Sequence, residues 1–314
     1  MSLTIDSVLL IGFGGPTSRE EIRPFLRQVV RGRNVPEERL EEVAHHYEAI
    51  GGRSPYHDHT LRQMRRLWQR LAARGHRIGA FVGYRNWHPF LADTVAKMAE
   101  RGHRRAAGLI LAPHRSPTSW ERYQLDVERA IATAGVSLAV RYPRPWHSDP
   151  LFLGAVADRI ETATGFGSGA WPAGRRLLFT AHSLPLAMAE GCDYAQEVTA
   201  SAAGVAALFG TDDWRVAYQS RSGDPRTPWL EPDLLDALAE AARDGAEGVV
   251  VVPIGFLCDH VEVLYDLDVE AKARAEALGL EFARVPTVGD HPDFIELLVR
   301  LTLEIDAAWA ATGE

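Results

Sequence analysis

Short apolar runs alternate with amphipathic stretches along the whole chain. The apolar runs consist mostly of Val, Leu, Ile and Ala, which is typical of strands in a parallel sheet that is covered on both faces. These runs lie at 5–13, 78–84, 106–112, 137–141, 175–181, 214–219, 247–254 and 280–285. The stretches with helical periodicity lie at 19–31, 37–48, 59–74, 89–102, 118–134, 149–163, 193–208, 232–243, 261–277 and 291–311. Because strands and helices alternate twice over, the pattern predicts an α/β fold with two doubly wound parallel sheets.

One stretch is the best candidate for the boundary between these two units. Residues 164–174, TGFGSGAWPAG, are rich in Gly, Ser and Pro and lie between a predicted helix and a predicted strand. We therefore predict an N-terminal α/β domain over 1–163 and a C-terminal α/β domain over 164–290. The last segment, 291–314, carries apolar residues at helical spacing and predicts a helix that could pack back on the first domain.

The composition narrows the kinds of protein that the chain can be. Of the 314 residues 46% are hydrophobic, and 42 acidic against 34 basic residues give a net charge of −8. This balance argues against a nucleic-acid partner. No apolar run reaches the ~18 residues that a membrane-spanning helix needs, and the first apolar run reads as a strand rather than a signal peptide. We therefore expect a cytoplasmic protein without an integral membrane segment.

The sequence lacks the signatures of the common cofactors. Its two cysteines, Cys192 and Cys258, are too few for a disulfide scaffold or a four-cysteine iron–sulfur cluster. The first turn, GFGGPT at 12–17, departs from the G-x-G-x-x-G pattern that binds dinucleotides. The chain has no P-loop, H-E-x-x-H or G-x-S-x-G motif. The sequence therefore carries none of the usual motifs for hydride transfer, phosphoryl transfer or the common hydrolase reactions.

Polar residues follow two of the predicted strands. His182 comes directly after the strand at 175–181, and Glu262 lies in the segment that follows the strand at 247–254. In open α/β sheets, ligands bind beyond the carboxyl ends of the strands, and parallel strands end at the same edge. We therefore expect these two side chains to converge. A lone histidine at a strand end is more often a residue that bonds the backbone, so the assignment depends on its neighbours.

Three carboxylates follow at regular spacing. Glu262, Asp266 and Glu270 are separated by four residues each. On a regular α-helix they drift slowly around one face, and a single π-helical turn would align them more strictly. A solvated acidic face is the alternative interpretation. Like charges at this spacing repel one another, which argues against a purely structural role. Because imidazole is a suitable ligand for Fe(II), the row could carry a divalent cation to His182.

Arginines and one tryptophan are further candidates for ligand contact. Arg31, Arg33 and Arg53 follow helices of the first domain, and a guanidinium pairs well with carboxylates of a ligand. Surface arginines without a ligand are the alternative. Trp229 precedes a polar turn, and such a residue either packs at a domain seam or forms a wall for a flat ligand.

Several segments together resemble ferrochelatase, the enzyme that inserts ferrous iron into a porphyrin during heme biosynthesis. The resemblance runs from about residue 8 to 272, and its AHSLP, YQSR…TPWLEP and DHVEVLYDLDVE segments are together highly specific. It implies a chelatase-like fold of two similar Rossmann-like domains with a porphyrin cleft between them. It also implies a metal chelatase of the lyase class, with Fe²⁺ as substrate and no organic cofactor or iron–sulfur cluster. The segments that carry it are LLIGFGGPTSREEIRPFL, VVRGRNVPEERL, HYEAIGGRSPYH, TAHSLP, VAYQSRSGDPRTPWLEPDL and PIGFLCDHVEVLYDLDVEAK.

By motif position, the resemblance also assigns roles around the metal. His182 is similar to the family's metal-side histidine, which accepts pyrrole protons, and Glu262 is similar to its facing carboxylate. Asp266 and Glu270 match an acidic row that conducts metal or protons. The resemblance thus implies that His182 and Glu262 are catalytic, and that all four residues contact the metal.

The same comparison of motifs implies contacts to the porphyrin. Ser54 and Arg31 fall in segments that hold propionates. Trp229 would form one wall of the site, beside the porphyrin ring. Phe13 stands where many relatives have Tyr or Met, so it can stack on the ring but cannot ligate iron. Arg115 stands where related compact bacterial enzymes often have Tyr, and an arginine should bind a propionate well.

The choice of porphyrin and the rival functions stay open at this point. The chain length, the YEAIGG-x-SP segment and the absence of an apolar lip resemble the branch that uses coproporphyrin III, which we favour over protoporphyrin IX. The polar segment at 31–55 would form the porphyrin entrance. One alternative is a cobalt or nickel chelatase that acts on another tetrapyrrole. The other is a heme or porphyrin carrier without catalysis. We expect a monomer.

Overall fold

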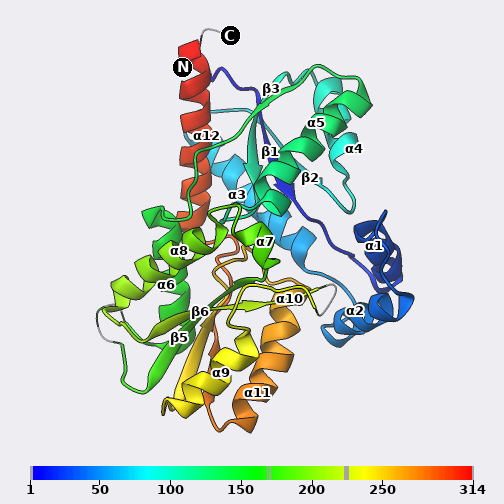
Figure 1. Cartoon of the computed structure of the whole chain (residues 1–314). Helices are drawn as coiled ribbons and strands as arrows, with labels where there is room; N and C mark the ends of the chain where they lie inside the picture. Colours follow the sequence, from blue (N-terminus) through cyan, green and yellow to red (C-terminus); the bar gives the residue numbers. More distant parts are fainter. Residues whose placement is uncertain (1–2, 168, 170, 223–225, 313–314) are drawn as a thin grey trace.

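Two parallel sheets form the framework of the protein. The computed structural model describes residues 3–167, 169, 171–222 and 226–312, so positions 168 and 170 of the glycine-rich stretch lie outside the described residues. The first sheet has the strand order β2-β1-β3-β4, and the second has the corresponding order β6-β5-β7-β8 (Figure 1). The strands are β1 (Ser7–Gly12), β2 (Gly79–Tyr84), β3 (Arg105–Ile110), β4 (Ala139–Arg141), β5 (Arg175–His182), β6 (Trp214–Gln219), β7 (Gly248–Val252) and β8 (Glu281–Arg284). The predicted α/β architecture with two similar parallel sheets is confirmed.

Helices connect the strands, as right-handed crossovers between parallel strands require. The α-helices are α1 (Ile22–Val29), α2 (Glu37–Ala49), α3 (Tyr56–Ala73), α4 (Leu91–Glu100), α5 (Arg122–Ala134), α6 (Pro150–Thr164), α7 (Leu186–Ala189), α8 (Tyr194–Phe209), α9 (Leu234–Arg243), α10 (Val261–Leu264), α11 (Lys272–Ala277) and α12 (Pro292–Thr312). Short turns of other geometry are η1 (Arg19–Glu21), η2 (Pro117–Glu121) and η3 (Asp266–Ala271), of which η2 and η3 are π-helical. The short helix α7 is absent from the sequence pattern, because four residues give no period to detect.

The helices α6 and α12 link the two halves of the chain. The helix α12, red in Figure 1, contacts α3 and β3 of the first half and α6 as well. The helix α6 also contacts α8 and β8 of the second half. The chain therefore crosses between the halves near both of these helices, and the division at residue 164 stays a prediction.

The apolar core runs through both sheets. Strand residues such as Leu10 and Phe179 are fully buried and belong to one continuous cluster that also includes α12 residues such as Phe294. A second cluster covers the other face of the second sheet, between it and helices α9 and α11. A third joins α1 and α2 to each other. None of the described helices combines the length and the hydropathy that crossing a bilayer requires.

Candidate active site

His182 is the last residue of β5, where the strand leaves the core. The Tyr194 hydroxyl donates to the His182 carbonyl at 2.9 Å, and the Ser183 amide donates to the Gln219 carbonyl at 2.8 Å. Nδ1 of the imidazole lies at hydrogen-bond distance from the Ser183 carbonyl, which can only accept. The ring proton is therefore assigned to Nδ1. Nε2 keeps a free lone pair, and about one third of the side chain is exposed.

The segment after β7 brings Glu262 to this histidine. A Cβ at Gly255 would lie 2.7 Å from Ala181, so glycine is needed for the segment to pass directly against β5. Nδ1 of His260 then accepts from the Glu262 amide at 3.2 Å and caps α10. Burial lowers the pKa of His260, which keeps the imidazole neutral and able to accept. As a result, Oε1 of Glu262 lies 3.7 Å from Nε2 of His182, and the expected convergence is found.

A π-helical turn carries the other two carboxylates. The amide of Glu270 donates to the Tyr265 carbonyl five residues earlier, at 3.1 Å, which is the π-helical pattern. Asp266 accepts a hydrogen bond from the Ser220 hydroxyl and lies 3.4 Å from the side-chain amide of Gln219. Ser220 has a φ of 61°, a strained value for a residue other than glycine. The turn that could align the acidic row is therefore present.

The charges in this row disfavour full ionisation. Burial, with nearby Glu262 and Glu270 as smaller causes, raises the pKa of Asp266 to about 7, against the lowering effect of the Ser220 hydrogen bond. Burial also raises the pKa of Glu270, with Asp233 and Glu42 as further causes. Within the described residues, no group of three or more His, Cys, Asp or Glu side chains could hold a metal ion jointly. The four predicted metal contacts thus form a row rather than one preformed centre.

The first half of the chain contributes an aromatic wall. Phe13 follows β1 and is 38% exposed, and its ring meets that of Phe25 edge-on at 6.2 Å. The Tyr56 hydroxyl accepts from the Phe13 amide at 3.0 Å, and the Tyr56 ring lies 6.2 Å from that of His260. Through Tyr56, the end of β1 therefore lies against the segment that carries Glu262. An exposed phenyl ring here provides a flat apolar surface.

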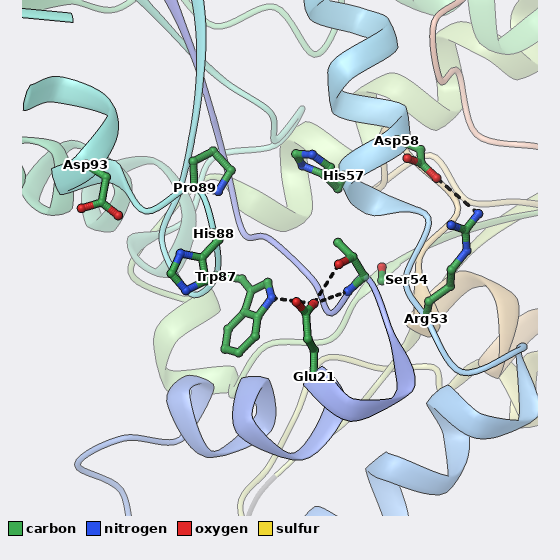
Figure 2. A pocket seen from close by; sticks show the side chains of 10 residues that line it. Glu21, Arg53, Ser54, His57, Asp58, Trp87, His88, Pro89 and Asp93 are labelled. Atoms are coloured by element: carbon green, nitrogen blue, oxygen red, sulfur yellow. Dashed lines mark hydrogen bonds and ion pairs between the residues drawn. The ribbon is translucent and has the colours of Figure 1, made fainter. Parts of the chain in front are cut away.

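A cavity of about 500 Å³ lies in the first half, and Ser54 is on its wall. Figure 2 shows that Glu21 accepts from the Trp87 indole, at 3.0 Å, and that Arg53 faces Asp58 at 3.4 Å. Trp87 also packs edge-on against Phe25, which joins this cavity to the aromatic wall around Phe13. Neither His182 nor Glu262 lines the cavity. Among the candidate ligand contacts, Ser54 and Arg53 therefore line this cavity.

Three predicted porphyrin contacts have different surroundings. Arg31 is exposed in the turn after α1, and its guanidinium forms no ion pair with a described residue. Trp229 is half-buried, and its backbone pairs with that of Pro185, next to α7. Arg115 instead pairs with Glu197: Nη2 lies 2.5 Å from Oε1, and Nε donates to the same oxygen at 2.6 Å. The guanidinium of Arg115 is therefore already engaged within the protein.

Sequence reasoning assigned no role to Gln219, Ser220, Tyr194 and His260, all of which touch the predicted pair or row. Gln219 is the last residue of β6, the neighbour of β5, and Ser220 follows it. The order of strands in a sheet is not written in a single sequence, so their proximity to Asp266 could not be derived. His260 did carry a signal, since a polar residue before a helical stretch is a candidate cap.

The structure has the fold of known chelatases. The sirohydrochlorin chelatase SirB from Bacillus subtilis subspecies spizizenii, in complex with cobalt, superimposes with a TM-score of 0.55 at 13% identity, over 95% of this chain and 94% of that one. The structure of SirB from Bacillus subtilis with Fe³⁺ gives a TM-score of 0.59 at 13% identity, over 97% of each chain. These likenesses establish the chelatase fold.

The chain belongs to the ferrochelatase family, whose model matches residues 6–305. It is 41% identical to the ferrochelatase of Rhodopirellula baltica over 303 residues, which are 95% of this chain and 86% of that protein. It is 39% identical to the coproporphyrin III ferrochelatase of Mycolicibacterium smegmatis over 307 residues, covering 96% of this chain and 90% of that protein. The resemblance seen in the sequence is confirmed. The protein is a metal chelatase that inserts metal into a porphyrin in heme biosynthesis.

Proposed function

We propose that the enzyme inserts Fe²⁺ into coproporphyrin III in preference to protoporphyrin IX, with His182 as the proton acceptor and Glu262 as its partner carboxylate. The observation that supports these roles is the 3.7 Å approach of Nε2 of His182 to Oε1 of Glu262. Both side chains are about one third exposed, so a ligand can reach them. A base and a carboxylate with access to one ligand are what metal insertion requires.

Insertion demands that two pyrrole protons leave while the iron sheds its water. Nε2 of His182 has the free lone pair, because Nδ1 is held by the Ser183 carbonyl. Imidazole is the side chain best suited to exchange a proton near neutral pH, and general-base catalysis is typically worth ~10²–10⁴-fold. Glu262 is the next acceptor for that proton. A base at a fixed position also favours a porphyrin with one pyrrole tilted out of the plane, at a strain of roughly 1–5 kcal/mol.

We assign the acidic row to the delivery of iron or the removal of protons. Oxygen ligands exchange divalent cations readily, and Asp266, with a pKa of about 7, can take up and release a proton near neutral pH. Glu270 lies at the exposed end of the row and Asp266 at its half-buried part. An ion or a proton can therefore pass along carboxylates between solvent and Glu262.

The preference for coproporphyrin III rests on charge. Coproporphyrin III has four propionates, whereas protoporphyrin IX has two propionates and two apolar vinyl groups. Arg31 and Arg33 are exposed beside α1, and neither guanidinium forms an ion pair with a described residue. Free guanidinium groups bind carboxylates well. The relatives named coproporphyrin III ferrochelatase, in Mycolicibacterium smegmatis and Mycobacteroides abscessus, support the same choice.

Anaerobic insertion of Fe²⁺ into the two porphyrins tests the proposal. We expect a higher kcat/KM with coproporphyrin III, and a loss of ~10²–10⁴-fold in His182→Ala with both substrates. A clear preference for protoporphyrin IX would overturn the substrate assignment. Unchanged insertion by His182→Ala would overturn the role of the histidine. An arm with Co²⁺ in place of Fe²⁺ tests the choice of metal.

Three further expectations belong to this proposal. The enzyme would need neither an organic cofactor nor an iron–sulfur cluster, since the chemistry described above uses only side chains and the substrate iron. Cys192 and Cys258 are both free thiols, as a reducing cytoplasm would keep them. We expect a monomer, which size measurements in solution would test.

A further inference from the structure

Arg284 is the last residue of β8, and its guanidinium contacts two aspartates of the segment that carries the acidic row. Its Nε donates to Oδ1 of Asp268 and its Nη2 to Oδ2 of Asp268, each at 2.7 Å. Its Nη1 forms an ion pair with Oδ1 of Asp259 at 3.3 Å, without the geometry of a hydrogen bond. Only 16% of the Arg284 side chain is exposed. A buried guanidinium that forms a parallel pair of bonds to one carboxylate fixes that carboxylate in both distance and direction.

The two aspartates lie on either side of Glu262 and Asp266 in the sequence. Asp268 is in the π-helical turn η3, between Asp266 and Glu270. Asp259 precedes His260, the residue that caps the helix carrying Glu262, and its Oδ1 also accepts from the Thr287 amide at 3.1 Å. One guanidinium therefore contacts both ends of the segment 259–268.

We propose that Arg284 is a positioning residue for metal insertion: it clamps Asp259 and Asp268 and thereby holds Glu262 and the π-helical turn toward His182. This inference rests on the proposed roles of His182 and Glu262. Arg284 is not expected to touch the porphyrin or the iron. It acts by fixing where the carboxylates stand.

Arginine is required here for its shape and its permanent charge. A π-helical turn has wider backbone bonding than an α-helix and is rare in proteins. The planar fork matches the two oxygens of Asp268, which a lysine ammonium cannot do. The fixed positive charge also offsets the repulsion among the carboxylates of the segment. Side chains that orient ligands in this way typically change metal affinity or activity by 10–100-fold when they are lost.

The chain offers a closely matched control in Arg176. This residue stands near the start of β5, at the opposite end of that strand from His182, and 10% of its side chain is exposed. It also joins two aspartates, with 2.7 Å to Asp213 and 2.8 Å to Asp244. Arg176→Lys therefore disturbs a similar buried arginine that lies far from the acidic row.

The experiment compares Arg284→Lys, Asp268→Asn and Arg176→Lys in the full chain, together with Glu262→Gln. Fe²⁺ insertion gives kcat and the KM for each substrate, quenching of porphyrin fluorescence gives porphyrin affinity, and thermal unfolding gives Tm. We expect kcat to fall roughly 10–100-fold in Arg284→Lys and Asp268→Asn, with the porphyrin affinity within about twofold of wild type. We expect Arg176→Lys to keep its kcat within about twofold of wild type, even if its Tm falls as far as that of Arg284→Lys. If Arg284→Lys fails to fold, Asp268→Asn carries the same test.

Two results would overturn the inference. Equal losses of kcat in Arg284→Lys and Arg176→Lys would mean that the arginine acts only through stability. Wild-type kcat in both Arg284→Lys and Asp268→Asn, beside an inactive Glu262→Gln, would remove the clamp while leaving the proposed function intact. A fully active Glu262→Gln would remove the proposed role of Glu262 itself, and with it the reason for the clamp.

Discussion

Nε2 of His182 lies 3.7 Å from Oε1 of Glu262, while Nδ1 of the same ring is held by the Ser183 carbonyl. A separation of 3.7 Å is too long for a direct hydrogen bond. Neither group is therefore committed to the other. Both can act on a substrate that approaches the two side chains from the solvent side, and a proton taken up by the imidazole has a carboxylate beside it.

This geometry predicts that the two residues act as a unit. His182→Ala and Glu262→Gln should each lower the rate of Fe²⁺ insertion by ~10²–10⁴-fold. The double variant should be little slower than the slower single variant, because removing one member already breaks the proton path. Single-turnover absorbance changes of the porphyrin measure all three rates. Losses that multiply in the double variant would show two independent functions instead.

The pairing of Arg115 with Glu197 predicts a loss of stability from Arg115→Gln. Glu197 is only 3% exposed, and the variant removes its guanidinium contacts. The carboxylate keeps the backbone amide at position 115 and lies 3.6 Å from Nδ1 of His147, so the loss should be about 1–3 kcal/mol of unfolding free energy. Urea unfolding measures this loss. The control is Arg53→Gln, because Arg53 and Asp58 form an exposed pair that should be worth about 0–1 kcal/mol. A raised KM for porphyrin with unchanged stability would instead support the propionate contact that the sequence suggests.

Much of the fold follows from the sequence because its strands are continuous apolar runs. The predicted run at 214–219 has the same bounds as β6. The predicted run at 175–181 is one residue shorter than β5, because the strand also includes His182. Buried parallel strands require such runs, so the signal is strong. The predicted helix at 261–277 is instead divided into α10, the π-helical η3 and α11. A π-helical turn is one of two ways to align the carboxylates, and the sequence alone does not decide between it and a regular helix.

The partners of individual side chains were harder to derive. His182 and Glu262 could be paired because both follow parallel strands of one sheet, and such strands share an edge. The sequence predicts that Arg115 faces a substrate, but in the structure it pairs with the buried Glu197. Nothing local in the sequence reveals this contact. Contacts of this kind depend on how α8 packs against the loop after β3, which a single sequence does not encode as a period.

The raised pKa of Asp266 predicts a dependence of stability on pH. The folded pKa is about 7 and the ordinary value is 3.8, so between these values the folded state keeps a proton that the unfolded state releases. The unfolding free energy should therefore fall as pH rises from about 4 to about 7, and stay lower above pH 7. Asp266→Asn removes this slope. Its Tm should exceed that of wild type at pH 8, and the difference should vanish near pH 4.

Thermal unfolding from pH 4 to pH 8, with a chelator present to exclude bound metal, measures this difference. Parallel curves for wild type and Asp266→Asn would contradict the raised pKa. A variant that is less stable at every pH would mean that the Ser220 hydrogen bond to the Asp266 carboxylate outweighs the electrostatic cost of burying it.

The exposed ring of Phe13 predicts a separation between binding and stability. Phe13 is 38% exposed, whereas its neighbour Phe25 is 1% exposed and belongs to the cluster between α1 and α2. Phe13→Ala should therefore weaken porphyrin binding about tenfold (~1.4 kcal/mol) with little change in Tm, because the lost ring would stack on the porphyrin rather than on the core. Phe25→Ala should cost about 3–5 kcal/mol of stability. Fluorescence quenching by porphyrin and thermal unfolding measure the two effects, and unchanged affinity in Phe13→Ala would exclude the ring from the porphyrin site.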